Sequence, residues 1–161
     1  MRSKYLFPSF LLVLVAIVGC NRQSQPDGMP PLRPVVLEFT QGGSPLAEAS
    51  VSVLPEDTDK RWFAGGATDA AGKLKPMTQG RYAGLAEGKY KITVIKTEID
   101  ESTVQRTEFG VSSTPVSYYL VDPKYADAAA TPLVLDVDKN TKTATFELGP
   151  AIRVKNESTG P

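Results

Sequence analysis

The sequence predicts an all-β fold, a β-sandwich of about seven strands in which two sheets enclose one apolar core. Runs of alternating apolar and polar residues recur along the chain, which is the pattern of strands with one buried face. Clusters of glycine, proline and aspartate separate these runs about every 8–12 residues, and no segment has the spacing of an amphipathic helix. Because a strand with one solvated face needs a second apolar layer on the other, the pattern favours a sandwich.

The strongest strand prediction covers residues 88–96, where apolar and polar residues alternate. Two glycine-centred turns precede it, at residues 69–72 and 87–88. Aspartate caps turns through its side chain and glycine adopts positive φ, so we expect Asp69 and Gly72 to close the first turn. The strand is expected to contribute three side chains to the core: Tyr90, Ile92 and Val94.

The remaining strands follow from the same alternation, and the last two are predicted to form a closing hairpin. Residues 98–119 begin polar and acidic and end apolar, which predicts one or two short strands preceded by a mobile loop. The final residues, 151–161, have the composition of a frayed tail. The other predicted strands cover residues 35–40, 49–53, 62–68, 133–137 and 144–148. The hairpin is expected to turn six side chains inward: Leu133, Leu135, Val137, Ala144, Phe146 and Leu148.

The N-terminus predicts a bacterial lipoprotein signal peptide. Arg2 and Lys4 supply a positive start, and the apolar run of thirteen residues that follows is shorter than the roughly 20 needed to span a bilayer. The run ends in Ile-Val-Gly-Cys at residues 17–20, which resembles the lipobox of bacterial lipoproteins, where the cysteine is diacylated and the chain is cut before it. The alternative is an ordinary signal peptide with an incidental cysteine, but secreted chains seldom keep an unpaired thiol.

The predicted segments are a signal peptide (1–19), a proline-rich, disordered tether from the lipidated Cys20 (20–33), a sandwich domain (34–150) and the tail. Two or three acyl chains anchor a protein stably, since each buried CH₂ contributes about 0.8 kcal/mol. The prolines of the tether are alternatively a ligand for a proline-recognition domain, but a linker is favoured after an anchor. We expect the domain to lie on the periplasmic or external side of the cell membrane or outer membrane. Asn21 after the cysteine favours the outer membrane, by analogy with known sorting rules.

Composition excludes several kinds of function. The chain has 18 basic and 18 acidic side chains, so no basic excess supports nucleic-acid binding. It has no histidine and one cysteine, which removes the commonest general base, the commonest metal ligand and any intrachain disulfide. A serine nucleophile needs a positioned base, and no serine lies in a recognisable catalytic motif. An enzyme is therefore the least favoured class.

Six segments carry a family resemblance: Gly43–Ala47, Ala49–Pro55, Thr68–Leu74, Gly88–Val94, Pro123–Asp127 and Thr131–Leu133. The first four resemble carboxypeptidase-regulatory-like, transthyretin-like domains, and the last two resemble the ending of small planctomycete-type lipoproteins of this class. The resemblance implies a prealbumin-like sandwich of seven or eight strands that serves as an accessory or cell-surface module without catalysis or cofactor. Two features depart from it: Lys75-Pro76 predicts a shortened or edge strand, and residues 98–119 have no counterpart. The histidines and C-terminal Tyr-Arg-Gly-Ser of the hydrolases in this class are absent.

Two groups of residues are candidates for a binding site: a set of oxygen ligands for a metal ion and a pair of aromatic side chains. The spacing of Asp136, Asp138, Asn140 and Glu147 matches oxygen positions 1, 3, 5 and 12 of an EF-hand loop, but the sixth position is Thr141 instead of glycine. A hairpin with a polar turn is therefore favoured and no metal site is predicted. Two aromatic residues are candidates for stacking on a ligand: Trp62 and Tyr118.

We therefore expect a lipid-anchored envelope protein whose sandwich is a structural or protein-interaction module. The alternative is a carbohydrate- or peptide-binding module at the cell surface, in which Trp62 or Tyr118 would stack on the ligand. Burial of Trp62 against the core is the favoured interpretation of that residue, because large aromatic side chains are mostly buried.

Lipidation of Cys20 predicts that Cys20→Ser releases the protein from membranes, because serine cannot form the thioether to the lipid. Membrane fractionation of cells that produce the two forms measures this release. Continued membrane association of the serine variant would contradict the lipoprotein assignment.

Overall fold

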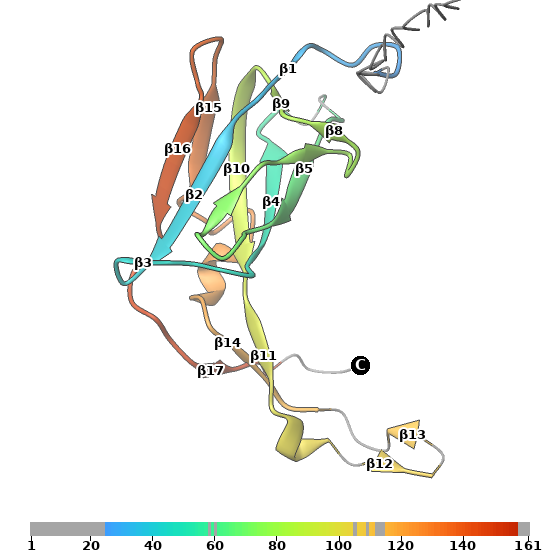
Figure 1. Ribbon diagram of the computed structural model, residues 1–161, viewed down its shortest axis with the longest axis vertical. Helices are drawn as coiled ribbons and strands as arrows, with labels where there is room; N and C mark the ends of the chain where they lie inside the picture. The colour runs from blue at the N-terminus through green and yellow to red at the C-terminus, as the bar shows by residue number, and fades with distance from the viewer. Residues whose placement is uncertain are drawn as a thin grey trace, which may run out of the picture.

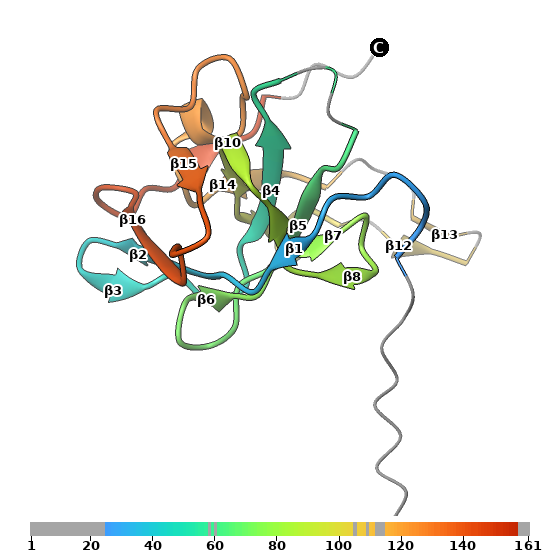
Figure 2. The ribbon, with the colours of Figure 1, turned by 90° about the horizontal axis from the view of Figure 1, so that it is seen from above.

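The structure is a computed structural model that describes residues 25–57, 59, 61–104, 106–108, 110–111 and 115–157. Cys20 and the predicted signal peptide lie outside the described residues. Within these residues the chain is all-β, as predicted, and helix is limited to two single 3₁₀ turns, η1 (Glu101–Thr103) and η2 (Pro123–Tyr125). Two sheets lie face to face around the apolar core, and a narrow arm extends from one end (Figures 1 and 2).

The first sheet has six strands, and all of its neighbouring strands are antiparallel. Its spatial order is β15 (Val134–Val137), β10 (Gly88–Ile95), β4 (Ser50–Pro55), β5 (Ala64–Ala67), β7 (Met77–Thr78) and β8 (Tyr82–Ala83). The long strand β10 is the one that the sequence predicts most strongly. Its three expected core residues are buried, with exposed fractions of 2% or less: Tyr90, Ile92 and Val94.

The second sheet is built around one strand near the N-terminus of the domain. It contains β16 (Thr143–Glu147), β2 (Val36–Gln41), β3 (Ser44–Pro45) and β6 (Lys73–Leu74). Strands β3 and β6 pair with β2 in antiparallel orientation, whereas β16 pairs with β2 in parallel, from Thr143 opposite Val36 to Glu147 opposite Thr40. The rings of Phe39 and Phe146, which are opposite one another in this pair, stack with centroids 5.3 Å apart.

The predicted closing hairpin is wrong, because β15 and β16 belong to different sheets. Strand β15 pairs with β10, and residues 138–142 carry the chain across to β2. The predicted inward side chains are nevertheless correct: Leu133, Leu135, Val137 and Leu148 are buried, and Ala144 and Phe146 pack against the core. The alternation of apolar and polar residues predicts which face of a strand is buried. This pattern is the same whether two strands pair in one sheet or face each other across the core, so it could not distinguish the two arrangements.

The turn at residues 69–72 is closed as predicted and also connects the two sheets. The Asp69 carboxylate accepts hydrogen bonds from the backbone N–H of Ala71 at 2.9 Å and of Lys73 at 2.8 Å. Gly72 has a φ of 72°, and its carbonyl accepts a 2.8 Å hydrogen bond from the N–H of Phe39. The chain therefore leaves β5 in the first sheet and joins β2 in the second through this turn.

The proline after this turn produces the shortened strand that the sequence predicts. Strand β6 ends at Leu74, and β7 begins at Met77 in the other sheet. Pro76 lies buried between them, where a residue without an N–H cannot continue the ladder of β6.

The end of the predicted tether forms part of the folded domain. Strand β1 (Leu32–Arg33) pairs with β9 (Leu85–Ala86), and Arg33 forms an ion pair of 2.6 Å with Glu87. The strand predicted over 62–68 is shorter, because β5 begins only at Ala64.

The arm begins where β10 continues into β11 (Thr97–Ile99) after the single residue Lys96. Strand β11 pairs with β14 (Ser117–Tyr119), and the ribbon of β12 (Arg106–Thr107) and β13 (Gly110–Val111) lies at the tip (Figure 1). The arm thus contains more strand than the one or two segments predicted. Part of the predicted frayed tail belongs to it, since β17 (Val154–Lys155) adds a third strand beside β14.

The close approach of Gly72 to β2 predicts a large loss of stability for Gly72→Ala. A Cβ at this position would lie 2.4 Å from the carbonyl oxygen of Phe39, and backbone atoms cannot move aside cheaply. We expect a cost of about 3 kcal/mol or more in the free energy of unfolding, measured by urea denaturation.

Gly80→Ala is the matched control for this prediction. Gly80 also has a positive φ, 67°, but no atom lies within 4 Å of the position that a Cβ would take there. Its substitution should cost only the left-handed backbone conformation, about 1–2 kcal/mol. Equal losses for the two variants would contradict the role of close packing at Gly72.

Candidate functional site

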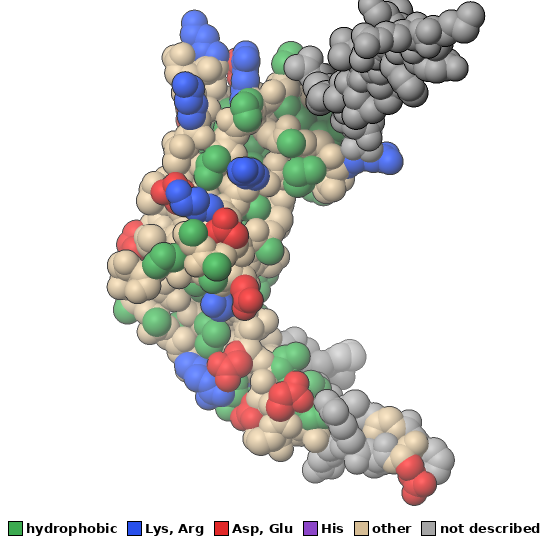
Figure 3. All heavy atoms as spheres, viewed as in Figure 1, with side chains coloured by type: hydrophobic (Ala, Val, Ile, Leu, Met, Phe, Trp, Pro, Cys, Tyr) green, Lys and Arg blue, Asp and Glu red, His purple; other side chains and the backbone are tan. Residues whose placement is uncertain are grey.

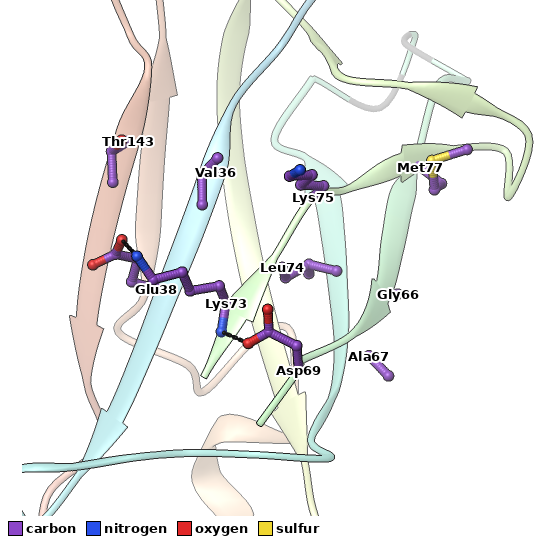
Figure 4. Close-up of a pocket in the computed structure, with 10 residues that line it drawn as sticks. All are labelled: Val36, Glu38, Gly66, Ala67, Asp69, Lys73, Leu74, Lys75, Met77 and Thr143. Atoms are coloured by element: carbon purple, nitrogen blue, oxygen red, sulfur yellow. Dashed lines mark hydrogen bonds and ion pairs between the residues drawn. The ribbon is translucent and has the colours of Figure 1, made fainter. Parts of the chain in front are cut away.

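An open groove of about 740 Å³ follows the seam between the two sheets, on the side where β6 crosses from the turn toward β7 (Figure 4). The second sheet contributes β2 and β16 to its walls, and the first sheet contributes β5 and β7. The lining residues are Val36, Glu38, Gly66, Ala67, Asp69, Lys73, Leu74, Lys75, Met77 and Thr143.

The charged side chains at the centre of the groove are already engaged with one another. Lys73 Nζ lies 2.8 Å from Glu38 Oε1, and the hydrogen bond to this carboxylate raises the pKa of Lys73. The Asp69 carboxylate is occupied by the backbone of its own turn, as Figure 4 shows for Lys73. The lining contains no aromatic ring, so the groove offers no stacking platform for a sugar.

The candidate calcium ligands do not converge. The hydroxyl of Thr141 donates to the Asp138 carboxylate at 2.7 Å, and the N–H groups of Asn140 and Thr141 donate at 2.8 Å. These bonds, the hydroxyl first, lower the pKa of Asp138 and close the connection between β15 and β16. Asp138 is thus the cap of a turn.

Glu147 lies at the other end of β16 and has a structural role of its own. Its carboxylate accepts hydrogen bonds from the Thr40 hydroxyl at 2.6 Å and from the Gly42 N–H at 2.9 Å, which lower the pKa of Glu147. Glu147 therefore fixes the turn between β2 and β3. Among the described residues, no three Asp, Glu, His or Cys side chains gather as a metal site would require.

The two aromatic candidates, Trp62 and Tyr118, lie at opposite ends of the sandwich. Strand register shows this: Ile95 pairs with Ser50, so the arm that carries Tyr118 leaves the sheet where β4 begins. Trp62 precedes Ala64, which pairs with Val53 near the end where β4 finishes. Trp62 is partly exposed, and it cannot share a ligand platform with Tyr118.

One face of the arm is charged and internally paired. Glu98, Tyr118 and Lys155 are cross-strand neighbours, and Arg153 joins them on this face. The Arg153 guanidinium lies 3.5 Å from the centroid of the Tyr118 ring and donates to Glu98 at 3.4 Å. One side of the Tyr118 ring is therefore covered by a residue of the chain itself.

The sequence alone did not reveal this contact, because Arg153 lies in the predicted tail. Residues far apart in the chain come together only through the pairing of β14 with β17. The one available signal was the alternation of charged and apolar residues from Arg153 to Lys155, which is too short to predict a strand.

The opposite face of the arm is apolar and exposed. Ile95 is the last residue of β10, and Thr97 and Ile99 follow it at every second position, on the same face. Tyr119 lies opposite Thr97, and Val154 lies opposite Tyr119, so these three residues form a cross-strand row on this face. The exposed fractions are 40% for Ile95, 52% for Ile99 and 48% for Val154. An open hollow of about 660 Å³ borders this face beside Tyr119 and Val154. We call these residues the apolar arm face.

Comparison with known proteins adds no family: no protein-family model, curated protein or solved structure matches this chain. Within the part of the chain that the structure describes, no helix is long and apolar enough to cross a membrane.

The contact between Arg153 and Tyr118 predicts that Arg153→Ala loosens β17. A partly exposed cation–π contact contributes about 0.5–1 kcal/mol, so amide exchange in the β14–β17 pair should become about 2–5 times faster. Amide hydrogen exchange at the N–H of Asn156, which bonds the carbonyl of Ser117, measures this. Lys155→Ala, a neighbouring cation that is not stacked on the ring, is the control, and an equal effect there would contradict the role of stacking.

Proposed function

We propose that this chain is a lipid-anchored envelope protein whose prealbumin-like sandwich, of the transthyretin and carboxypeptidase-regulatory-like type, holds a protein-interaction arm away from the membrane. The lipobox sequence at Cys20 supports the anchor. The observation that carries the proposal is the placement of tether and arm at opposite ends of the first sheet (Figure 1).

The register of β10 defines these two ends. Strand β1, where the tether joins the fold, pairs with β9 just before the first residue of β10, Gly88. The arm follows the last residue of β10, Ile95. Eight extended residues span about 27 Å at ~3.4 Å each, so the sandwich separates the arm from the point where the tether joins the fold by about this length.

The apolar arm face has the chemistry of a protein-contact surface. Exposed apolar side chains that form a continuous patch are typical of interaction sites. The surrounding sequence is acidic, with four carboxylate residues and one arginine between residues 97 and 119. In Figure 3, acidic and apolar side chains occur together on the arm, with Lys and Arg side chains beside them at its base and along the rest of the face. A partner protein with an apolar surface and basic groups at its rim would complement this arm.

The proposal predicts that Ile99→Ser with Val154→Ser abolishes cross-linking of the anchored protein to one envelope protein. These side chains are about half exposed, so the double variant should remain folded. Photo-cross-linking from residue 97 in intact cells, read by mass spectrometry, measures the loss.

Val134→Ser is the matched control, since Val134 is 47% exposed on β15 and lies outside the arm. It should leave the cross-link unchanged. Equal cross-linking in all variants would contradict the proposed surface. A cross-linked product that contains only this chain would contradict a separate partner protein and show that the arm binds a second copy of the same chain.

A further inference from the structure

The most exposed large apolar side chain among the described residues is Phe63, which is 57% exposed and lies beside the partly exposed Trp62. Its backbone is held in place: the N–H of Gln79 donates to the carbonyl of Phe63 at 2.9 Å. Gln79 and Gly80 form the tight turn between β7 and β8, with φ values of 52° and 67°. We call Trp62 and Phe63 the aromatic tip. The hydrogen bond to Gln79 fixes the backbone of the aromatic tip, and the exposed Phe63 side chain is not part of the core.

The aromatic tip lies at the same end of the sandwich as the tether. Strand β1 pairs with β9 and also lies beside β8, whose partner β7 carries the turn that holds Phe63. In Figure 1, β1, β8 and β9 gather at the end opposite the arm.

The tether is too short to hold this end far from its attachment point. The six residue steps from Cys20 to Pro26 span at most about 21 Å when fully extended. Beyond them the chain folds back in a turn, in which the N–H of Met29 donates to the carbonyl of Pro26 at 3.1 Å. A short link of this kind gives the attached end a high effective concentration at any surface to which Cys20 is fixed.

We propose that the aromatic tip is a membrane-contact site, in which Phe63 and the edge of Trp62 insert among the lipid headgroups of the bilayer that anchors Cys20. This inference rests on the proposed function, because it requires the lipid anchor. Aromatic side chains favour the interface between headgroups and hydrocarbon. The charges nearby have both signs, because residues 56–61 and Arg81 together carry three acidic and three basic groups, so apolar insertion drives the contact.

Contact at this tip sets the orientation of the whole molecule. A lipid anchor alone allows the domain to tumble about the tether, whereas a second contact fixes one end of the sandwich against the bilayer. The arm, at the opposite end, then points away from the membrane.

The single tryptophan of the chain makes this contact directly measurable, since all tryptophan fluorescence comes from Trp62. The full-length, lipidated protein is reconstituted in vesicles of phosphatidylethanolamine and phosphatidylglycerol, with or without brominated acyl chains. We expect a blue-shifted emission that brominated lipid quenches. Phe63→Ser should lose most of this quenching and still float with the vesicles.

Ile99→Ser is the matched control, because Ile99 is similarly exposed at the far end of the molecule. It should leave the quenching unchanged. Flotation with the vesicles but without quenching of Trp62 would overturn the contact site and leave the anchor intact, as would equal losses in the two variants. Failure of the wild-type protein to float would instead overturn the anchor, and with it this inference.

Discussion

The hydrogen bond from the N–H of Phe39 to the carbonyl of Gly72 holds the turn by which the chain crosses from β5 of the first sheet to β6 of the second against β2. It depends on a residue without a side chain, since any Cβ at position 72 would meet the backbone of β2. The neighbouring Thr68 hydroxyl reinforces the junction: it donates to the carbonyl of Leu46 at 2.6 Å and accepts from the N–H of Ala49 at 2.9 Å. Both Thr68 bonds are buried, so they hold the start of β4 to the end of β5 without competition from water.

This junction explains how one small domain presents two different ends. With the sheets locked together, β10 acts as a rigid connection between the end that receives the tether and the end that continues into the arm. The conspicuous glycine turns thus serve the architecture, and the exposed apolar surfaces, the aromatic tip and the apolar arm face, lie at the two extremes. The groove between the sheets is an open hollow, yet its central charges, Lys73 and Glu38, neutralise each other.

The sequence predicted which side chains are buried much better than which strands pair. Alternation identified Tyr90, Leu135 and Leu148 as core residues because burial is a local property of strand faces. It could not assign β16 to β2, because pairing across the whole domain leaves no local trace. Pro76 was informative, since a missing N–H has a definite consequence for a strand. Arg153 was not, because its contacts with Tyr118 and Glu98 exist only in the folded arm.

The parallel pairing of β2 with β16 also has a consequence for the order of folding. Thr40 and Glu147, which share a hydrogen bond, are 107 positions apart. The second sheet cannot be completed until nearly the whole chain is available, and contacts of such long sequence separation slow folding. The second sheet therefore stays incomplete during synthesis until β16 emerges, and a domain that is completed late is easier to thread across a membrane before it folds.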